Sequence, residues 1–164
     1  MKIICLGDSF TQGYLLEKSY VDYLSDYGYE TINWGRNGDT TSDILYRFKE
    51  KECDLLILFA GTNDLYQGIS AEEALENIKK ILKKSKADKN LLIIPPLIEE
   101  EESYQIYEMI NRAINNFADM ITNLSYPTVD ARKVEASYFL DGLHMREDFH
   151  KRLADEIIKT IENI

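Results

Sequence analysis

Cysteine, proline and histidine are all scarce in this chain of 164 residues. The two cysteines, Cys5 and Cys53, lie in or beside apolar stretches, and neither has a histidine close in sequence. They therefore indicate no disulfide framework, zinc cluster or thiol nucleophile, and we interpret them as reduced packing residues. Histidine occurs only as His144 and His150. Because His150 falls inside a helical pattern, we interpret it as a structural or surface residue.

Long hydrophobic runs and an excess of positive charge are also missing. No stretch approaches the roughly 18 apolar residues of a membrane span. The first apolar run is too short for a signal peptide and continues directly into a glycine loop, which predicts a cytoplasmic protein. The net charge of −10 argues against nucleic-acid binding and against stable membrane association, because both need a basic surface. Solubility is the simplest explanation of the acidity.

The chain does contain alternating strand and helix patterns. Apolar runs that end in glycine or small polar residues predict buried strands over residues 2–6, 29–34, 54–60, 91–94 and 126–129. Apolar residues at helical spacing predict helices over residues 17–27, 42–51, 71–86, 103–120 and 148–161. The expected helix caps are Thr41 or Ser42, Ser70 and Asp148. This order predicts an α/β fold, a three-layer α/β/α sandwich with about five parallel strands, in one domain over residues 1–164.

Several polar residues follow the ends of separate predicted strands. Ser9 follows the first strand, Gly38 the second and Asn63 the third, and His144 lies in the loop after the fifth. The carboxyl ends of parallel strands share one edge of the sheet, where ligands bind, so we expect these residues to lie close together. Asp141 precedes His144 by three residues, close enough in sequence for its carboxylate to accept a hydrogen bond from the imidazole.

These residue types meet the needs of a serine nucleophile. The Ser9 hydroxyl must give up its proton during attack, and the neutral imidazole of His144 can accept it. The carboxylate of Asp141 would fix the tautomer of that imidazole. The backbone N–H groups of Ser9 and Gly38 and the side-chain amide of Asn63 can donate to an oxyanion. Each element alone is more often structural, and only their placement on one edge favours catalysis.

Four sequence blocks also resemble a known family. They look like the four blocks of the SGNH hydrolases, also called the GDSL esterase/lipase family, in that family's order: residues 7–13 (GDSFTQG), 37–41 (NGDTT), 61–64 (GTND) and 141–144 (DGLH). The resemblance implies a flavodoxin-like fold in which Ser9 is the nucleophile, His144 the general base and Asp141 its partner. It implies an oxyanion hole formed by Ser9, Gly38 and Asn63. It also implies cleavage of carboxylic esters or thioesters without a metal or cofactor.

Two other functions remain open. An acyltransferase or a carbohydrate deacetylase would use the same residues on a different acceptor or substrate. A small-molecule binding module could hold a phosphate at the glycine loops, but the chain lacks P-loop and dinucleotide motifs. The Gly-x-Ser-x-Gly elbow of ordinary α/β-hydrolases is absent as well.

The substrate is expected to be a small-molecule ester with a small or single-chain acyl group. The short loops leave no room for a large lid, and the acidic composition disfavours anionic substrates. Position after the strands predicts pocket walls at Phe10, Trp34, Tyr66, Leu97 and Tyr138. The sequence leaves the oligomeric state undetermined.

Overall fold

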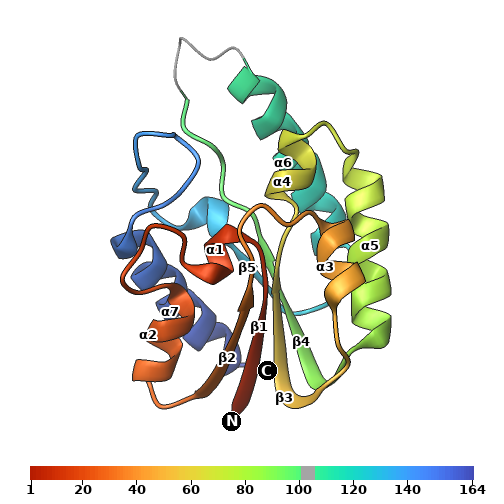
Figure 1. Ribbon diagram of the computed structural model, residues 1–164, viewed down its shortest axis with the longest axis vertical. Coiled ribbons are helices and arrows are strands. Elements are labelled where there is room, and N and C mark those ends of the chain that lie inside the picture. The colour runs from red at the N-terminus through yellow and green to blue at the C-terminus, as the bar shows by residue number, and fades with distance from the viewer. Residues whose placement is uncertain (101–105) are drawn as a thin grey trace.

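A five-stranded parallel sheet forms the centre of the protein (Figure 1). The computed structural model describes residues 1–100 and 106–164. The strands are β1 (Lys2–Gly7), β2 (Glu30–Gly35), β3 (Glu52–Phe59), β4 (Lys86–Ile94) and β5 (Thr128–Asp130). The helices are α1 (Ser9–Gln12), α2 (Tyr20–Asp26), α3 (Thr41–Arg47), α4 (Thr62–Tyr66), α5 (Ala71–Lys84), α6 (Ile106–Thr122) and α7 (Glu147–Ile161), and a 3-10 turn covers Ala131–Lys133.

The strand order places a ligand-binding crevice beside β1. The order β2-β1-β3-β4-β5 is that of flavodoxin-like sheets, in which the direction of strand addition reverses at β1 and β3, while all strands stay parallel. Ligands of such sheets bind at this switch point, outside the carboxyl ends of the strands. Ser9 begins α1, directly after β1, and therefore lies at the switch point.

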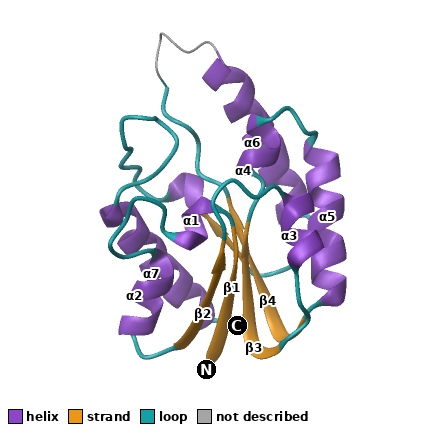
Figure 2. Ribbon diagram, viewed as in Figure 1, coloured by secondary structure: helices purple, strands orange, loops and turns teal. Residues whose placement is uncertain are grey.

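Alternate residues of the central strands pack into two separate cores. Ile4 and Leu6 of β1 belong to the core that includes residues of α3, α5 and α6, whereas Ile3 and Cys5 belong to the core formed with α2 and α7. Figure 2 shows these two groups of helices on opposite sides of the sheet. Because both faces are covered, β1 and β3 are unbroken apolar runs. The predicted three-layer α/β/α sandwich is confirmed.

The ends of several elements differ from the prediction. β4 begins at Lys86 rather than Leu91, and its added residues pair with β3. These added residues include the charged Lys86, Asp88 and Lys89. This part of the sequence therefore lacks the apolar pattern that predicts a buried strand. α3 ends at Arg47 rather than near Lys51, because β3 already begins at Glu52. The predicted helix over residues 103–120 corresponds to α6, and residues 103–105 lie outside the described part of the chain.

Of the predicted helix caps, only Ser70 is correct. Its side chain accepts a hydrogen bond from the backbone N–H of Glu73 at 3.1 Å. Thr40, rather than Thr41 or Ser42, caps α3, since it forms a reciprocal capping box with Asp43. Asp148 is not the cap of α7, because it lies in the first turn of that helix.

Two short helices were not predicted, and both carry candidate site residues. α1 has four residues and α4 has five, too few to show a helical period in the sequence. Asp8 caps α1 by accepting a hydrogen bond from the Phe10 N–H at 3.0 Å. Ser9 and Asn63 thus occupy first turns, where backbone N–H groups lack partners within the helix.

The structure also bears on two expectations from composition. Cys5 and Cys53 are free and buried, which confirms them as reduced packing residues. Among residues 1–100 and 106–164, no helix combines the length and apolarity that crossing a membrane requires.

Candidate active site

Three side chains from the two ends of the chain form a continuous hydrogen-bonded line. His144 Nδ1 lies 2.6 Å from Asp141 Oδ2, and His144 Nε2 lies 3.1 Å from Ser9 Oγ. Because a carboxylate can only accept, Nδ1 carries the proton, and the lone pair of Nε2 faces the Ser9 hydroxyl. The structure therefore brings together the nucleophile, base and carboxylate expected from the sequence, although 135 positions separate Ser9 from His144.

The loop that carries His144 is held by its own backbone. Asp141 Oδ1 accepts hydrogen bonds from the N–H groups of Leu143 at 3.0 Å and His144 at 2.9 Å. Tyr138 and Met145 form an antiparallel bridge at the base of the loop. The Glu99 N–H donates to the Gly142 carbonyl at 2.8 Å, which ties the loop to the segment after β4. Asp141 thus orients both the imidazole and the loop.

The Asp141 carboxyl is held in its charged form. Partial burial acts to raise its pKa, but hydrogen bonds from the His144 ring and from the backbone of His144 and Leu143 outweigh burial and lower it. The Asp141 side chain is 43% exposed, whereas that of His144 is 14% exposed. Water therefore has access to the Asp141 end of the hydrogen-bonded line from Asp141 to Ser9.

Three groups that could donate to an oxyanion lie beside Ser9. Gly7 pairs in register with Gly35 of β2 and Phe59 of β3, so the loops that carry Gly38 and Asn63 leave the sheet at the level of Ser9. Within residues 1–100 and 106–164, the backbone N–H groups of Ser9 and Gly38 have no hydrogen-bond acceptor.

The side chain of Asn63 has one donor to spare. Asn63 Nδ2 donates to the Asp39 carbonyl at 2.9 Å, and its second hydrogen stays available. Gly38 adopts a φ of 81°, a left-handed conformation that favours glycine. The loop that presents the Gly38 N–H, directly before Asp39, therefore depends on this conformation.

Two residues next to the site were missed by the sequence analysis. The ring of Tyr14 lies 4.9 Å from the His144 ring, centroid to centroid. Arg47 donates to the carbonyl of Gly7, two residues before Ser9, at 2.9 Å. Tyr14 lies close to Ser9 in the chain, since its N–H donates to the Ser9 carbonyl at 3.1 Å, but its contact with His144 depends on the fold. Arg47 reaches Gly7 only through the folding of distant segments.

His150 has a structural role, in agreement with its interpretation from the sequence. It is buried, and its Nδ1 accepts a hydrogen bond from the Tyr20 N–H at 3.3 Å. Burial lowers the pKa of His150 to about 4, so its ring is neutral near pH 7.

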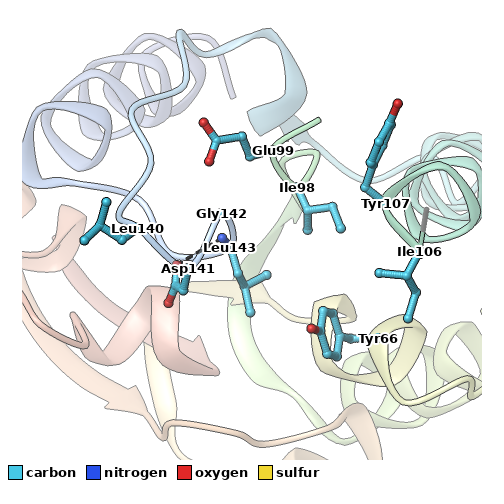
Figure 3. Close-up of a pocket in the computed structure, with 9 residues that line it drawn as sticks. All are labelled: Tyr66, Ile98, Glu99, Ile106, Tyr107, Leu140, Asp141, Gly142 and Leu143. Carbon is cyan, nitrogen blue, oxygen red and sulfur yellow. Dashed lines mark hydrogen bonds between the residues drawn. The ribbon is translucent and has the colours of Figure 1, made fainter. Parts of the chain in front are cut away.

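A cavity of about 260 Å³ lies next to Asp141. In Figure 3, Leu143, Tyr66, Ile98 and Ile106 surround the same space, while the Glu99 carboxylate points away from it. The complete lining comes from α4, the segment after β4, α6 and the His144 loop: Tyr66, Ile98, Glu99, Ile106, Tyr107, Leu140, Asp141, Gly142 and Leu143. Its walls present polar and apolar surface in nearly equal parts, and they include two carboxylates.

Of the predicted pocket walls, only Tyr66 lines this cavity. Phe10 is buried in the core and stacks on Phe59 at 5.0 Å between ring centroids. Leu97 and Tyr138 hydrogen bond to each other, through the Tyr138 hydroxyl and the Leu97 carbonyl, and do not line the cavity. Trp34 packs against the core of the α3, α5 and α6 face. Position after a strand did not reveal which way these side chains point.

A family model provides the decisive comparison. The model of the GDSL-like lipase/acylhydrolase family matches residues 5–152, nearly the whole chain. The protein belongs to this family. This GDSL hydrolase is accordingly an enzyme that hydrolyses esters, and the resemblance found in the sequence blocks is confirmed.

Solved structures share the fold of this GDSL hydrolase at low sequence identity. A member of the lipolytic protein G-D-S-L family from Veillonella parvula matches with a TM-score of 0.79 and 16% identity, over 100% of both chains. The aryl esterase of M. smegmatis matches with a TM-score of 0.75 and 17% identity, over 99% of this chain and 98% of its own. A carbohydrate acetylesterase family member from Sinorhizobium meliloti matches with a TM-score of 0.72 and 17% identity, over 99% of this chain and 97% of its own. Among curated protein sequences, none matches this chain significantly.

Proposed function

We propose that the protein is a serine hydrolase that cleaves small carboxylic esters through an acyl-enzyme on Ser9. The observation that carries the proposal is the line of hydrogen bonds from Asp141 through His144 to Ser9. In a protein of the GDSL family, this line has the composition and order of a catalytic triad.

In the acylation step, Ser9 Oγ attacks the ester carbonyl carbon and its proton passes to His144 Nε2. The carbonyl oxygen becomes an oxyanion, which accepts hydrogen bonds from the N–H groups of Ser9 and Gly38 and from Asn63 Nδ2. Asp141 stabilises the imidazolium formed on His144. The C–O bond to the alcohol then breaks, and the alcohol leaves with the proton from Nε2.

In the deacylation step, water takes the place of the alcohol. The water oxygen attacks the acyl carbon while His144 Nε2 accepts a proton from the water. The second tetrahedral intermediate collapses to a carboxylic acid, and Ser9 Oγ recovers its proton. An acyltransferase would instead pass the acyl group to a bound alcohol, and adding alcohol acceptors to the assay distinguishes the two.

The role of Ser9 as the nucleophile can be tested by covalent labelling. A fluorophosphonate probe is expected to label the native protein on Ser9 Oγ and to leave Ser9→Ala unlabelled, measured by fluorescence after denaturing electrophoresis. Circular dichroism of both proteins controls for loss of fold. Equal labelling of the two proteins would refute Ser9 as the nucleophile.

We further propose that the cavity beside Asp141 receives the acyl group of the substrate. A cavity of about 150 Å³ can hold benzene, so one of about 260 Å³ has room for a phenyl ring or about six carbons in a chain. The acetyl group, named for one structural neighbour, is small enough for this cavity. Glu99 and Asp141 at the cavity disfavour anionic acyl groups.

The size of the cavity predicts a limit on acyl chain length. For p-nitrophenyl esters of two to twelve carbons, kcat/KM is expected to be highest at about four to eight and to fall for longer chains. Tyr66→Ala should move the optimum to longer chains because it removes an exposed wall of the cavity. Tyr46→Ala, which removes a fully solvated tyrosine on α3, serves as the control. An optimum that Tyr66→Ala leaves in place would show that the acyl group binds elsewhere.

The remaining expectations from the sequence complete the proposal. Residues 1–164 act as one hydrolase domain, which accords with the family match over residues 5–152. The net charge of −10 supports a partner that is a small-molecule ester rather than a nucleic acid. The free thiols of Cys5 and Cys53 accord with a cytoplasmic location. Acetylated sugars added to the ester panel test the carbohydrate deacetylase alternative.

A further inference from the structure

Arg47 joins the end of β1 to the loop after β2. It is the last residue of α3, and its Nη2 donates to the Gly7 carbonyl at 2.9 Å. Its Nε donates to Asp39 Oδ2, so one guanidinium holds both acceptors. The Asp39 side chain is only 8% exposed and that of Arg47 23% exposed. Ion pairs of planar guanidinium groups at such depth have a fixed geometry.

Each acceptor of Arg47 is attached to a proposed catalytic group. Gly7 is two residues before Ser9, and Asp39 directly follows Gly38. The Asp39 carbonyl also accepts the hydrogen bond from Asn63 Nδ2. Arg47 therefore connects the backbone of the nucleophile to both other donors of the proposed oxyanion hole.

The helix that carries Arg47 is itself fixed to the neighbouring loop. The backbone N–H of Thr41, at the start of α3, donates to Asp64 Oδ2 at 2.9 Å, and its hydroxyl donates to Asp64 Oδ1. Asn77 Nδ2 donates to Thr41 Oγ1 at 3.1 Å. Asp64 follows Asn63 in α4. These hydrogen bonds therefore hold α3, and with it Arg47, against the segment that carries the Asn63 amide.

Arg47 also offsets negative charge behind the site. Asp8, Asp39 and Asp64 are all buried there, and Asp8 Oδ2 has no hydrogen-bond partner within the described residues. Burial raises the pKa of Asp8 to about 7, with smaller contributions from Asp64 and Asp39. Within residues 1–100 and 106–164, the one other ion-pair partner of Asp39 is the exposed Arg36, whose Nε lies 3.9 Å from Asp39 Oδ1.

We propose that Arg47 is a positioning residue, which aligns the Gly38 N–H and the Asn63 amide with Ser9 so that all three donors converge on the oxyanion. The inference rests on the proposed function of these three residues. Arg47 itself contacts no reacting atom, since both of its acceptors belong to the protein. Donor geometry matters in the transition state, where displacements of about 1 Å cost large factors in rate.

The proposal predicts a loss in kcat rather than in substrate binding. Arg47→Gln is expected to lower kcat about 10- to 100-fold with KM changed less than about threefold, measured with a p-nitrophenyl ester. Arg47→Lys should recover part of the loss, because an ammonium keeps the charge but lacks the fork that joins the two acceptors. The matched control is Arg132→Gln, since Arg132 forms an ion pair with Asp130 at similar exposure, 22% and 14%, and should leave kcat unchanged.

A double-mutant cycle separates positioning from a general loss of stability. If Arg47 acts in part through the Asn63 amide, Arg47→Gln should lower kcat by a smaller factor in the Asn63→Ala background than in the native protein. Multiplicative losses in the double variant, or a full kcat in Arg47→Gln, would overturn the inference. Thermal melting of each variant identifies proteins that fail to fold, and Arg47→Lys then carries the test. Failure of the proposed function is distinct, because the wild-type activity would then survive Ser9→Ala.

Discussion

His144→Ala is expected to lower kcat by about 10⁴-fold or more, while the protein remains folded. In the proposed mechanism His144 is the only group that accepts the proton of Ser9 and returns it to the leaving alcohol. Its Nε2 lies 3.1 Å from Ser9 Oγ, within reach of direct transfer. Removing a base of this kind from a triad costs about as much as removing the nucleophile. Steady-state hydrolysis of a p-nitrophenyl ester of about four carbons measures the loss.

The second histidine of the chain provides the matched control. His150 is buried in α7 and bonds to the Tyr20 backbone, so His150→Gln should lower the melting temperature yet keep kcat within about threefold. If the two variants lost activity equally, His144 would have no special role. Retention of activity by His144→Ala would remove the triad from the mechanism.

Asn63→Ala is expected to lower kcat by about 10²- to 10³-fold, with a small change in KM. The side-chain amide would bind the oxygen only when it becomes an oxyanion, so its removal affects the transition state more than the bound substrate. Asn63→Asp should show a similar or larger loss. It keeps the shape of the side chain, but it replaces the donor with an acceptor and adds a negative charge. Saturation kinetics with the same ester separate kcat from KM.

A control for Asn63 comes from another side-chain amide. Asn115 lies in α6 and accepts a hydrogen bond from Arg132, outside the proposed site. Asn115→Ala should therefore leave both kcat and KM unchanged. Should Asn63→Ala retain full kcat, the oxyanion would have to be bound by the backbone N–H groups of Ser9 and Gly38 alone.

Sequence reasoning succeeded best where a local pattern carries the information. Apolar runs such as Leu55–Phe59 form strands because a strand covered on both faces needs apolar residues at consecutive positions. Ser70 and Glu73 mark the start of α5 because the capping hydrogen bond joins residues three apart. Patterns of this kind depend on near neighbours, so they are readable before the chain is folded.

Short or polar elements escaped the same reasoning. α1 and α4 are shorter than the stretch needed to show a helical period, and both follow glycine-containing turns that indicate loops. The first part of β4 carries Lys86, Asp88 and Lys89, and it becomes a strand only by pairing with β3. Pairing between strands is a tertiary interaction, and local propensity does not record it.

By itself, the sequence predicted the α/β sandwich and the five residues of the proposed site: Ser9, Gly38, Asn63, Asp141 and His144. It did so because parallel strands deliver their following loops to one edge of the sheet. The tertiary structure alone decided the 3.1 Å contact between Ser9 and His144, the link from Arg47 to Gly7 and Asp39, and the walls of the cavity. Side-chain directions and contacts between distant segments arise from packing of the whole chain, which no local pattern encodes.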